Sequence, residues 1–294
     1  MRSFLKKVLS QFSRIFTWSI AWEITAIREY MREDRKLRID EYIRKNLHKN
    51  PRYADTKKLN KFEYQVYSQN GEDGIIHEIF ERIGVTNKFF FEFGVESGTE
   101  CNTLALLMQG WQGCWLDGNS GYVRDARKKF SRFIEVGKLQ IKEAFVTAEN
   151  IEELLRSAGA PKDLDLLSID IDGNDYWVWK AIADFLPRVV VIEYNAMYYP
   201  PIEFSVTYDP LRKYVGTSYF GASLSSFEKL GAKKGYKLVG CNFTGVNAFF
   251  VREDLVGDMF AAPFTAEHHH EPPRYFAVTT FGHKRDIGPF EAPR

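Results

Sequence analysis

The chain has 294 residues, of which 45% are hydrophobic, 27% charged and 15% aromatic. These values exclude a disordered, collagen-like or low-complexity protein and suit a globular protein with a sizeable core. The 40 basic residues nearly balance the 39 acidic ones, which leaves a net charge of +1. We therefore expect no nucleic-acid partner, because no overall positive field would draw the protein onto a polyanion.

Residues 1–22 predict a basic amphipathic helix. Apolar residues recur every three to four positions from Leu5 to Trp22, and four basic residues but no acidic one precede Glu23. Such a helix can dock on this protein or on a second copy of it, which would make a homo-oligomer, or it can make a peripheral contact with an anionic membrane. Residues 28–50 follow with dense mixed charge, which is typical of a solvated helix.

The sequence contains no run of about 18 apolar residues, so we predict no membrane-spanning helix. Its three cysteines, Cys101, Cys114 and Cys241, are scattered and odd in number, which is typical of reduced thiols in a cytosolic protein. We therefore expect a cytoplasmic protein, which would lie at the inner face of the membrane if residues 1–22 bind lipid.

From residue 66 onward, predicted helices alternate with short, strongly apolar strands. Strands this apolar are buried on both faces, so we expect an α/β fold with a mostly parallel sheet and helices on both sides. The last two strands, joined by a short turn, predict an antiparallel hairpin. The predicted helices cover 75–83, 103–108, 149–158 and 224–230, and the predicted strands lie within 88–98, 113–118, 139–146, 163–175, 188–196, 236–242 and 247–253.

We divide the chain into three parts on these patterns. Residues 1–60 form a helical extension, residues 61–254 form the α/β domain, and residues 255–294 form a C-terminal extension. We expect this last part to pack on the domain or on a partner copy.

A glycine-rich loop follows the first predicted strand and opens a helix. It contains Glu92, Gly94, Glu96 and Gly98. Its glycines let a ligand approach the backbone, but its acids would repel a pyrophosphate and favour a ligand with a cationic end. S-adenosylmethionine fits, because it carries a sulfonium and an ammonium group and no phosphate. Asp117, at the end of the next strand, could take its ribose hydroxyls. The alternative is a purely structural turn.

Residues 66–252 resemble a class I S-adenosylmethionine-dependent methyltransferase, and the motifs most resemble its FkbM-type branch, largely O-methyltransferases acting on sugars and natural products. The resemblance implies a Rossmann-like seven-stranded sheet whose last strand is antiparallel. It also implies that the loop acids and glycines hold the methionine part, that Ala144 and Phe145 flank the adenine, and that residues 68–73 could close over the cofactor. The residues expected to bind the cofactor are Gln69, Asn70, Asp73, Glu92, Gly94, Glu96, Gly98, Asn102, Asp117, Ala144, Phe145 and Asp170.

Acidic residues crowd the end of the fourth strand, where many FkbM relatives have an acid-x-Glu-Gly sequence and this chain has Asp170-Ile-Asp172-Gly. Neighbouring strands are about 4.8 Å apart, so Glu193 and Asn195 on the next strand can converge with these acids. Oxygen ligands of this kind suit Mg²⁺, held by Asp170, Asp172, Glu193 and Asn195. The alternatives are a general base without metal, drawn from Asp170, Asp172 and Glu193, or helix capping by Asp172 and Asp175.

A long aromatic-rich stretch with several prolines separates Glu193 from the final hairpin, and long irregular connections of this kind are often functional lids. Aromatic faces with hydroxyl tips suit stacking on a sugar, and in this stretch Arg212 and Lys213 could meet an anionic substrate. The residues expected to contact the substrate are Tyr194, Tyr198, Tyr199 and Tyr219.

These features together predict an S-adenosylmethionine-dependent O-methyltransferase that acts on a hydroxyl of a sugar, a glycan or a related small molecule, with or without help from Mg²⁺. The D-x-D sequence at residues 170–172 also occurs in metal-dependent glycosyltransferases, and its surroundings resemble the nucleophile motif of one class of phosphatase. A third alternative is a binding module that keeps the methyltransferase fold without catalysis. The sequence does not give the acceptor or the position methylated.

Overall fold

A computed structural model of the chain describes residues 2–213, 215–277 and 290–291, and for residues 2–19, 32, 33, 36, 290 and 291 it describes the backbone alone. The chain divides into two compact units, Met1–Pro51 and Arg52–Arg294. The division falls before the boundary near residue 60 that the composition indicated, because residues 52–60 belong to the second unit.

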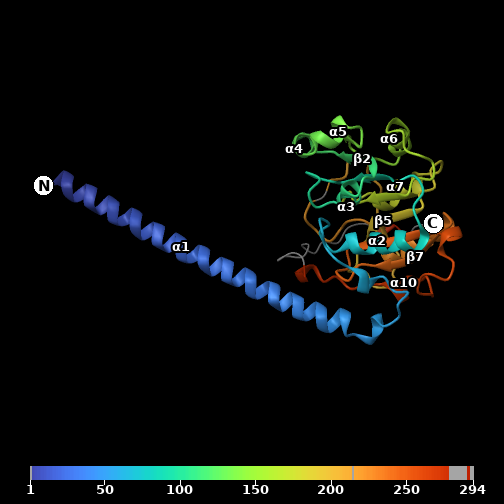
Figure 1. The fold of residues 1–294 in the computed structure, drawn as a ribbon, viewed down its shortest axis with the longest axis horizontal. Coiled ribbons are helices and arrows are strands. Elements are labelled where there is room, and N and C mark those ends of the chain that lie inside the picture. Colours follow the sequence, from blue (N-terminus) through green and yellow to red (C-terminus); the bar gives the residue numbers. More distant parts are fainter. Residues whose placement is uncertain (1, 214, 278–289, 292–294) are drawn as a thin grey trace. The chain divides into compact units, whose positions relative to one another are not determined.

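The N-terminal unit is one continuous helix, α1 (Arg2–Ile43), followed by a π-helical turn at Arg44–His48 (Figure 1). The sequence indicated two helical segments, but no Gly or Pro precedes Pro51 to interrupt them. The side chains of residues 1–19 lie outside the described part, so the predicted apolar stripe is not placed. Among the described residues, none of the helices combines the length and the apolar character that crossing a bilayer requires.

The second unit is built on a seven-stranded sheet with the spatial order β3-β2-β1-β4-β5-β8-β7. All neighbouring pairs up to β5 are parallel, and β8 runs antiparallel to β5 and to β7. This order confirms the predicted Rossmann-like methyltransferase sheet with its reversed last strand. The strands are β1 (Phe89–Phe93), β2 (Gln112–Asp117), β3 (Leu139–Glu143), β4 (Leu166–Ile169), β5 (Val189–Glu193), β7 (Tyr236–Cys241) and β8 (Asn247–Arg252).

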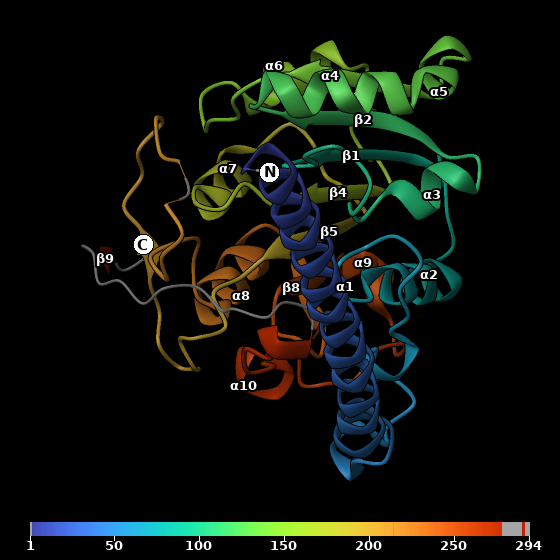
Figure 2. The same ribbon diagram turned by 90° about the vertical axis from the view of Figure 1, so that its left-hand side faces the viewer.

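Helices cover both faces of this sheet, as predicted (Figure 2). Successive residues of β1 enter different cores: Phe89 and Phe91 pack with α6, α7 and α8, while Phe90 packs with α2, α3 and α4. The helices are α2 (Glu72–Ile83), α3 (Leu104–Met108), α4 (Ser120–Lys129), α5 (Ser131–Glu135), α6 (Ile151–Ser157), α7 (Asp175–Ala181), α8 (Leu224–Lys233), α9 (Glu253–Val256) and α10 (Ala266–His269). The sequence did not indicate α4 and α5, because these helices are rich in charged residues and have few apolar residues at helical spacing.

Short elements complete the second unit. Three 3₁₀ turns lie at Pro51–Tyr53, Asn60–Phe62 and Tyr275–Ala277, and β6 (Ser205–Val206) pairs with β9 (Phe290–Glu291) in a small antiparallel sheet. All three cysteines are buried, free thiols.

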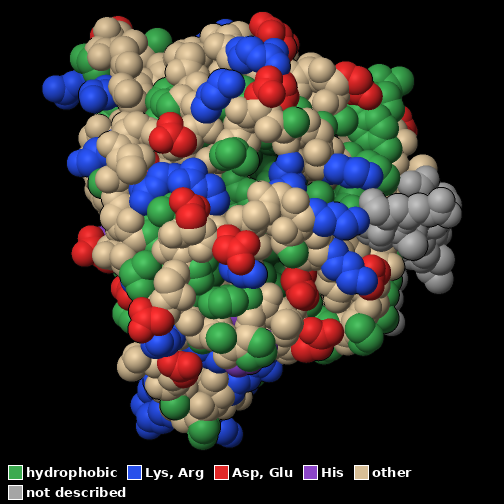
Figure 3. Space-filling model, turned by 90° about the vertical axis from the view of Figure 1, so that its right-hand side faces the viewer, with side chains coloured by type: hydrophobic (Ala, Val, Ile, Leu, Met, Phe, Trp, Pro, Cys, Tyr) green, Lys and Arg blue, Asp and Glu red, His purple; other side chains and the backbone are tan. Residues whose placement is uncertain are grey.

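The charges of the surface are interspersed. The face drawn in Figure 3 mixes Lys and Arg side chains with Asp and Glu side chains, and apolar side chains lie between them. This mixture agrees with the net charge of +1 for the whole chain.

One buried carboxylate aligns the starting ends of three strands. Asp165 is fully buried, accepts hydrogen bonds from the backbone N–H groups of residues 86–88, and pairs with Arg188 at 2.6 Å. Arg188 in turn donates to the carbonyl oxygens of Ile83 and Gly84 at the end of α2. The segments before β1, β4 and β5 are thereby joined at the edge of the sheet opposite to the carboxyl ends.

We therefore expect Asp165→Ala to lower the free energy of unfolding by about 3–5 kcal/mol, because the substitution leaves a buried guanidinium and several backbone donors without their acceptor. Urea unfolding followed by circular dichroism measures this change. The control is Asp163→Ala, an exposed carboxylate two residues earlier, for which we expect a change within about 0.5 kcal/mol. Equal effects of the two substitutions would contradict the role given to Asp165.

Candidate active site

A cavity of about 1110 Å³ opens at the carboxyl ends of the strands. The strand order reverses direction between β1 and β4, and ligands of open α/β sheets bind at such a point. A smaller cavity of about 230 Å³ adjoins it and shares several of its lining residues. The shared residues are Gln69, Asn70, Gly94, Glu96 and Asp170.

The glycine loop brings the ends of β1 and β4 into close contact. Gly94 has φ 80°, and a Cβ built on it would lie 1.5 Å from the carbonyl oxygen of Asp170. No other residue fits there without moving one of the two loops. Gly98 has φ 75° and faces the ring of Trp115, which a Cβ would approach to 2.6 Å. Gly94 lines both cavities, whereas Gly98 shapes the loop by packing and lines neither.

Glu92 and Asn102 form one wall of the smaller cavity. Glu92 is buried, and its two oxygens accept from the backbone N–H groups of Asn102 and Thr103 and from the hydroxyls of Thr103 and Ser168. The Asn102 amide donates to the same Ser168 hydroxyl. Burial raises the pKa of Glu92. Its carboxyl group thus fixes the start of α3, which is a structural role beside the predicted cofactor contact.

Asp117 is fixed at the end of β2 by two backbone donors. One carboxylate oxygen accepts from the N–H of Glu96 at 2.8 Å, and the other from the N–H of Asn119 at 2.7 Å. Each oxygen keeps a lone pair for a further donor. Glu96 itself has φ 49°, an uncommon value for a residue with a side chain, and burial followed by the charges of Asp117 and Glu100 raises its pKa.

The residues predicted to flank an adenine lie beside Asp117. The N–H of Ala144 donates to the carbonyl of Asp117 at 3.0 Å, and the ring of Phe145 lies against Gly118. Ala144 and Phe145 line the larger cavity together with Tyr122, from the first turn of α4. Tyr122 was not among the predicted site residues, although its position five residues after Asp117, just beyond the end of a predicted strand, places it at the same edge of the sheet.

The segment before α2 contributes Gln69 and Asn70 to the cavities. Asp73 lines neither of them. One of its carboxylate oxygens accepts from the backbone N–H groups of residues 66–68, and the Ser68 hydroxyl accepts from the N–H of Asp73. Asp73 therefore holds this segment in shape, which differs from its predicted contact with the cofactor.

Three acids converge where β4 and β5 end. Asp170, Asp172 and Glu193 each place a carboxylate oxygen within 4.8 Å of the others. Burial and then the neighbouring carboxylates raise the pKa values of Asp170 and Glu193 well above their usual range, and burial raises that of Asp172 to about 6. Glu193 is 8% exposed, and one of its oxygens is buried without a hydrogen-bond partner. We call this group the acidic triad.

The fourth acid of the region, Asp175, has a structural role. Its two oxygens accept from the N–H groups of Ile171 and Gly173, both at 2.8 Å. Burial raises its pKa to about 6. Both donors precede α7, and its N-cap residue Asn174 makes no side-chain cap hydrogen bond. Asp175 thus shapes the loop that carries Asp170 and Asp172, which differs from the predicted capping of the helix.

The other predicted metal ligand, Asn195, serves a different segment. Its amide nitrogen donates to the carbonyls of Ser218 and Phe220, and its amide oxygen accepts from the N–H of Met197. The amide thus fastens the long connection after β5, which differs from the role of a fourth ligand of the triad.

The four tyrosines predicted to contact the substrate do not line the larger cavity. Tyr194 is fully buried and points away from Glu193, because successive residues of an extended chain face opposite sides. Its hydroxyl donates to the carbonyl of Glu271. Tyr198 packs on Phe204, Tyr199 on His270, and the ring of Tyr219 lies under the guanidinium of Arg212.

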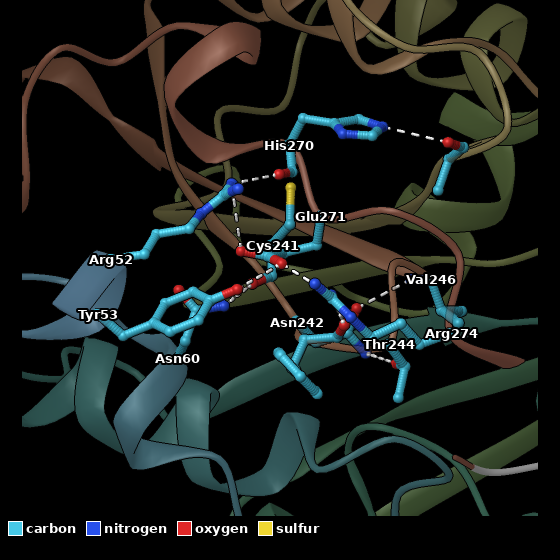
Figure 4. Close-up of polar contacts among 12 residues, drawn as sticks. Arg52, Tyr53, Asn60, Cys241, Asn242, Thr244, Val246, His270, Glu271 and Arg274 are labelled. Atoms are coloured by element: carbon cyan, nitrogen blue, oxygen red, sulfur yellow. Dashed lines mark hydrogen bonds and ion pairs between the residues drawn. The ribbon is translucent and has the colours of Figure 1, made fainter. Parts of the chain in front are cut away.

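A polar network joins the start of the second unit to its C-terminal extension (Figure 4). The buried carboxylate of Glu271 accepts from the Tyr53 hydroxyl at 2.7 Å and from Arg274 at 2.8 Å, and Arg52 donates to the carbonyl of His270. The described part of the C-terminal extension thus packs on the domain, as one of the two alternatives predicted. Tyr275, next to this network, reaches the cavity wall, which no sequence signal indicated.

No protein-family model and no curated protein matches this chain. Among solved structures, it is similar to the N-terminal domain of EvdMO1 with SAH bound, at 14% identity over 75% of this chain and 94% of that one, with a TM-score of 0.42. It is also similar to magnesium protoporphyrin IX methyltransferase (ChlM) from Synechocystis PCC 6803 with bound SAM, at 12% identity over 74% and 97% of the two chains (TM-score 0.41). A third is the O-methyltransferase from Bacillus cereus in complex with SAH, at 13% identity over 72% and 88% (TM-score 0.39). Likeness at this level concerns the fold, and the chemistry of the site rests on its own residues.

The acidic triad makes stability depend on pH. The pKa of Asp172 is about 6 in the folded chain, against about 3.9 for an unfolded aspartate, so the folded state binds more protons between these values. The stability that this provides is present below about pH 4 and is lost as the pH rises through about 6. Because the pKa values of Asp170 and Glu193 are raised further, the free energy of unfolding continues to fall at higher pH.

We therefore expect Asp170→Asn to be more stable than the wild-type protein at pH 8, by on the order of 1 kcal/mol, because one of the repelling charges is gone. The difference should shrink toward pH 4. Urea unfolding in EDTA at both pH values measures it, with the exposed Asp125→Asn as the control. A wild-type protein as stable as Asp170→Asn at pH 8 would contradict this account of the triad.

Proposed function

We propose that this protein is an S-adenosylmethionine-dependent O-methyltransferase of the FkbM type, acting on a hydroxyl of a sugar, a glycan or a related small molecule. The observation that carries the proposal is that one cavity holds both a place for the methyl donor and a cluster of acids beside it. The first is formed by Gly94, Asp117 and Phe145, and the second is the acidic triad.

The lining of the cavity fits the donor. Gly94 lines both cavities, and each oxygen of Asp117 has a lone pair left for a ribose hydroxyl. The acids around it favour a cationic ligand over a phosphate. When bound, S-adenosylmethionine supplies a methyl group on a sulfonium sulfur, which is an already activated donor.

The chain's own residues then position the acceptor and take its proton. Asp172 suits the role of general base. A pKa of about 6 leaves its carboxylate ionised at neutral pH, and a base is most effective when its pKa lies near the pH of the reaction. The cavity would hold the acceptor hydroxyl in line with the methyl donor. Bringing two reactants together in the right orientation removes a large part of the activation barrier of a bimolecular reaction.

The triad also fits Mg²⁺. Three carboxylates supply the hard oxygen ligands that this ion prefers, and one oxygen of Glu193 is buried without a hydrogen-bond partner among the described residues. Asp170, Asp172 and Glu193 would hold the ion, which would supply Lewis acidity toward the acceptor hydroxyl. The same acids leave a glycosyltransferase or phosphatase as the alternative enzyme, but neither accounts for Gly94 and Asp117.

We expect wild-type protein to bind S-adenosylhomocysteine in titration calorimetry, and Asp117→Ala to bind it roughly 10- to 100-fold more weakly, because hydrogen bonds to a charged group contribute about 1.5–3 kcal/mol. The matched control is Asp125→Ala, an exposed aspartate on α4, which should bind normally. Repeating the titration with Mg²⁺ and with EDTA distinguishes a metal site from a metal-free base. Absence of binding in the wild-type protein would refute the proposed function.

We further propose that residues 1–22 make a peripheral membrane contact, which would place the enzyme near membrane-bound glycans. The support is the sequence itself, in which four basic residues and no acid accompany an apolar stripe. Reversing two of these charges, Lys6→Glu with Lys7→Glu, should weaken co-sedimentation with vesicles containing phosphatidylserine by roughly tenfold or more, at about 1 kcal/mol per charge. Unchanged sedimentation would exclude an electrostatic contact, leaving protein docking as the use of the helix.

A further inference from the structure

The larger cavity has two basic side chains, Arg212 and Lys213, among the residues that line it. Both lie on the long connection between β6 and α8. The other charged residues of the lining are five acids: Glu96, Asp117, Asp170, Asp172 and Glu193. The smaller cavity next to Gly94 has neither Lys nor Arg in its lining.

Several contacts hold Arg212 in place. Its backbone N–H donates to the carbonyl of Asp209, its guanidinium donates to the carbonyl of Thr207 at 2.9 Å, and the ring of Tyr219 lies 5.1 Å below. Asn174 ties the same turn to the loop after β4 by donating to the carbonyl of Asp209 at 2.7 Å.

The side chain of Arg212 lies on the loop that carries Asp170 and Asp172. A Cβ built on Gly173 would approach the Cδ of Arg212 to 2.8 Å, so the absence of a side chain at position 173 makes room for it. Gly173 follows Asp172 in sequence, so Arg212 packs on the residue next to the proposed base.

This guanidinium nevertheless forms no ion pair with any carboxylate in the part of the chain that the structure describes. Its Nε is buried without a hydrogen-bond partner, and so is the side-chain oxygen of Asn174 beside it. Leaving a buried donor of a charged group unsatisfied costs free energy, which an anionic ligand would recover. The planar fork of an arginine suits carboxylate and phosphate groups in particular.

The methyl donor does not account for Arg212. In the proposed arrangement its amino-acid end lies by Gly94 and Glu92, at the smaller cavity, and Arg212 is absent from that lining. The arginine instead packs on Gly173 and lines the larger cavity together with the acids that would receive the acceptor hydroxyl.

We propose that the acceptor carries an anionic group, a carboxylate or a phosphate, which Arg212 and Lys213 bind while the hydroxyl to be methylated lies at the acidic triad. This inference rests on the proposed function and narrows its substrate class to acidic or phosphorylated sugars and related hydroxylated anions.

The test uses three probes that share one ring and differ only at carbon 6: D-glucose, D-glucuronate and D-glucose 6-phosphate. Each is titrated calorimetrically into the full-length protein saturated with S-adenosylhomocysteine. We expect at least one anionic probe to bind about tenfold or more tightly than glucose, because charge-assisted bidentate hydrogen bonds are roughly twice as strong as neutral ones. Preference for the glucuronate or for the phosphate identifies the anion.

The variant Arg212→Met should abolish this preference, and Arg212→Lys should restore part of it. Arg132→Met, which removes an exposed arginine on α5, is the matched control and should keep the preference. Normal binding of S-adenosylhomocysteine by Arg212→Met shows that the variant is folded.

Three results would overturn the inference: equal affinity for all three probes, binding of none of them, or a preference that survives in Arg212→Met. Each is read with S-adenosylhomocysteine bound, so each is distinct from failure of the proposed function, in which the wild-type protein does not bind S-adenosylhomocysteine at all.

Discussion

The close approach of two backbones at Gly94 is the constraint on which the site depends. The carbonyl oxygen of Asp170 lies 1.5 Å from where a Cβ would stand, so a side chain at position 94 would force the loops after β1 and β4 apart. These two strands are neighbours at the point where the strand order reverses. Because the loops are in contact there, the fixed carboxylate of Asp117 and the acidic triad border one cavity instead of two separate ones.

The acids around this cavity fall into two groups by their hydrogen-bond partners. Glu92, Asp117 and Asp175 accept from backbone N–H groups and so hold the loops in shape. No backbone N–H group of the described residues donates to Asp170 or Glu193. Their pKa values rise well above the usual range because burial and the neighbouring charges both oppose ionisation. Asp170 and Glu193 therefore lower the stability of the folded state, most of all when both carboxyl groups are ionised. A cation or a proton would compensate these charges, and carboxyl groups with pKa values shifted in this way cluster at functional sites.

Most of the fold could be predicted from the sequence, because runs such as Phe89–Phe93 and Val189–Glu193 are too apolar for anything but a doubly covered sheet. Asp117 and the triad lie at the ends of predicted parallel strands. Because the carboxyl ends of parallel strands lie at the same edge of a sheet, the sequence also indicated that these acids border one site.

The predicted substrate contact of Tyr194 failed because of side-chain direction. Tyr194 follows Glu193, so its side chain faces the opposite side, and the alternation of side chains along β5 indicates this direction from the sequence alone. The roles of Asp73 and Asn195 are hydrogen bonds to particular backbone groups of irregular segments, and neither spacing nor composition encodes them. Tyr275 follows Arg274 of the Glu271 network, in which Arg52 and Tyr53 contact residues 218 positions later in the chain, and no local pattern predicts such contacts.

The groups that the fold leaves unpaired define what a ligand has to supply. An oxygen of Glu193, the Nε of Arg212 and the side-chain oxygen of Asn174 are all buried without partners, and all three residues line the same cavity. Arg212 and the triad line this cavity together, and opposite charges in one buried site would ordinarily pair, because each loses its hydration on burial. Here Arg212 is held by Thr207 and Tyr219 and its guanidinium bonds to no carboxylate of the triad. A molecule that satisfied both sides would present hydroxyl oxygens or a bound cation to the acids and an anion to the arginine. An acidic or phosphorylated sugar has both kinds of group, and a neutral sugar would leave the Nε of Arg212 without the charged partner that its burial calls for.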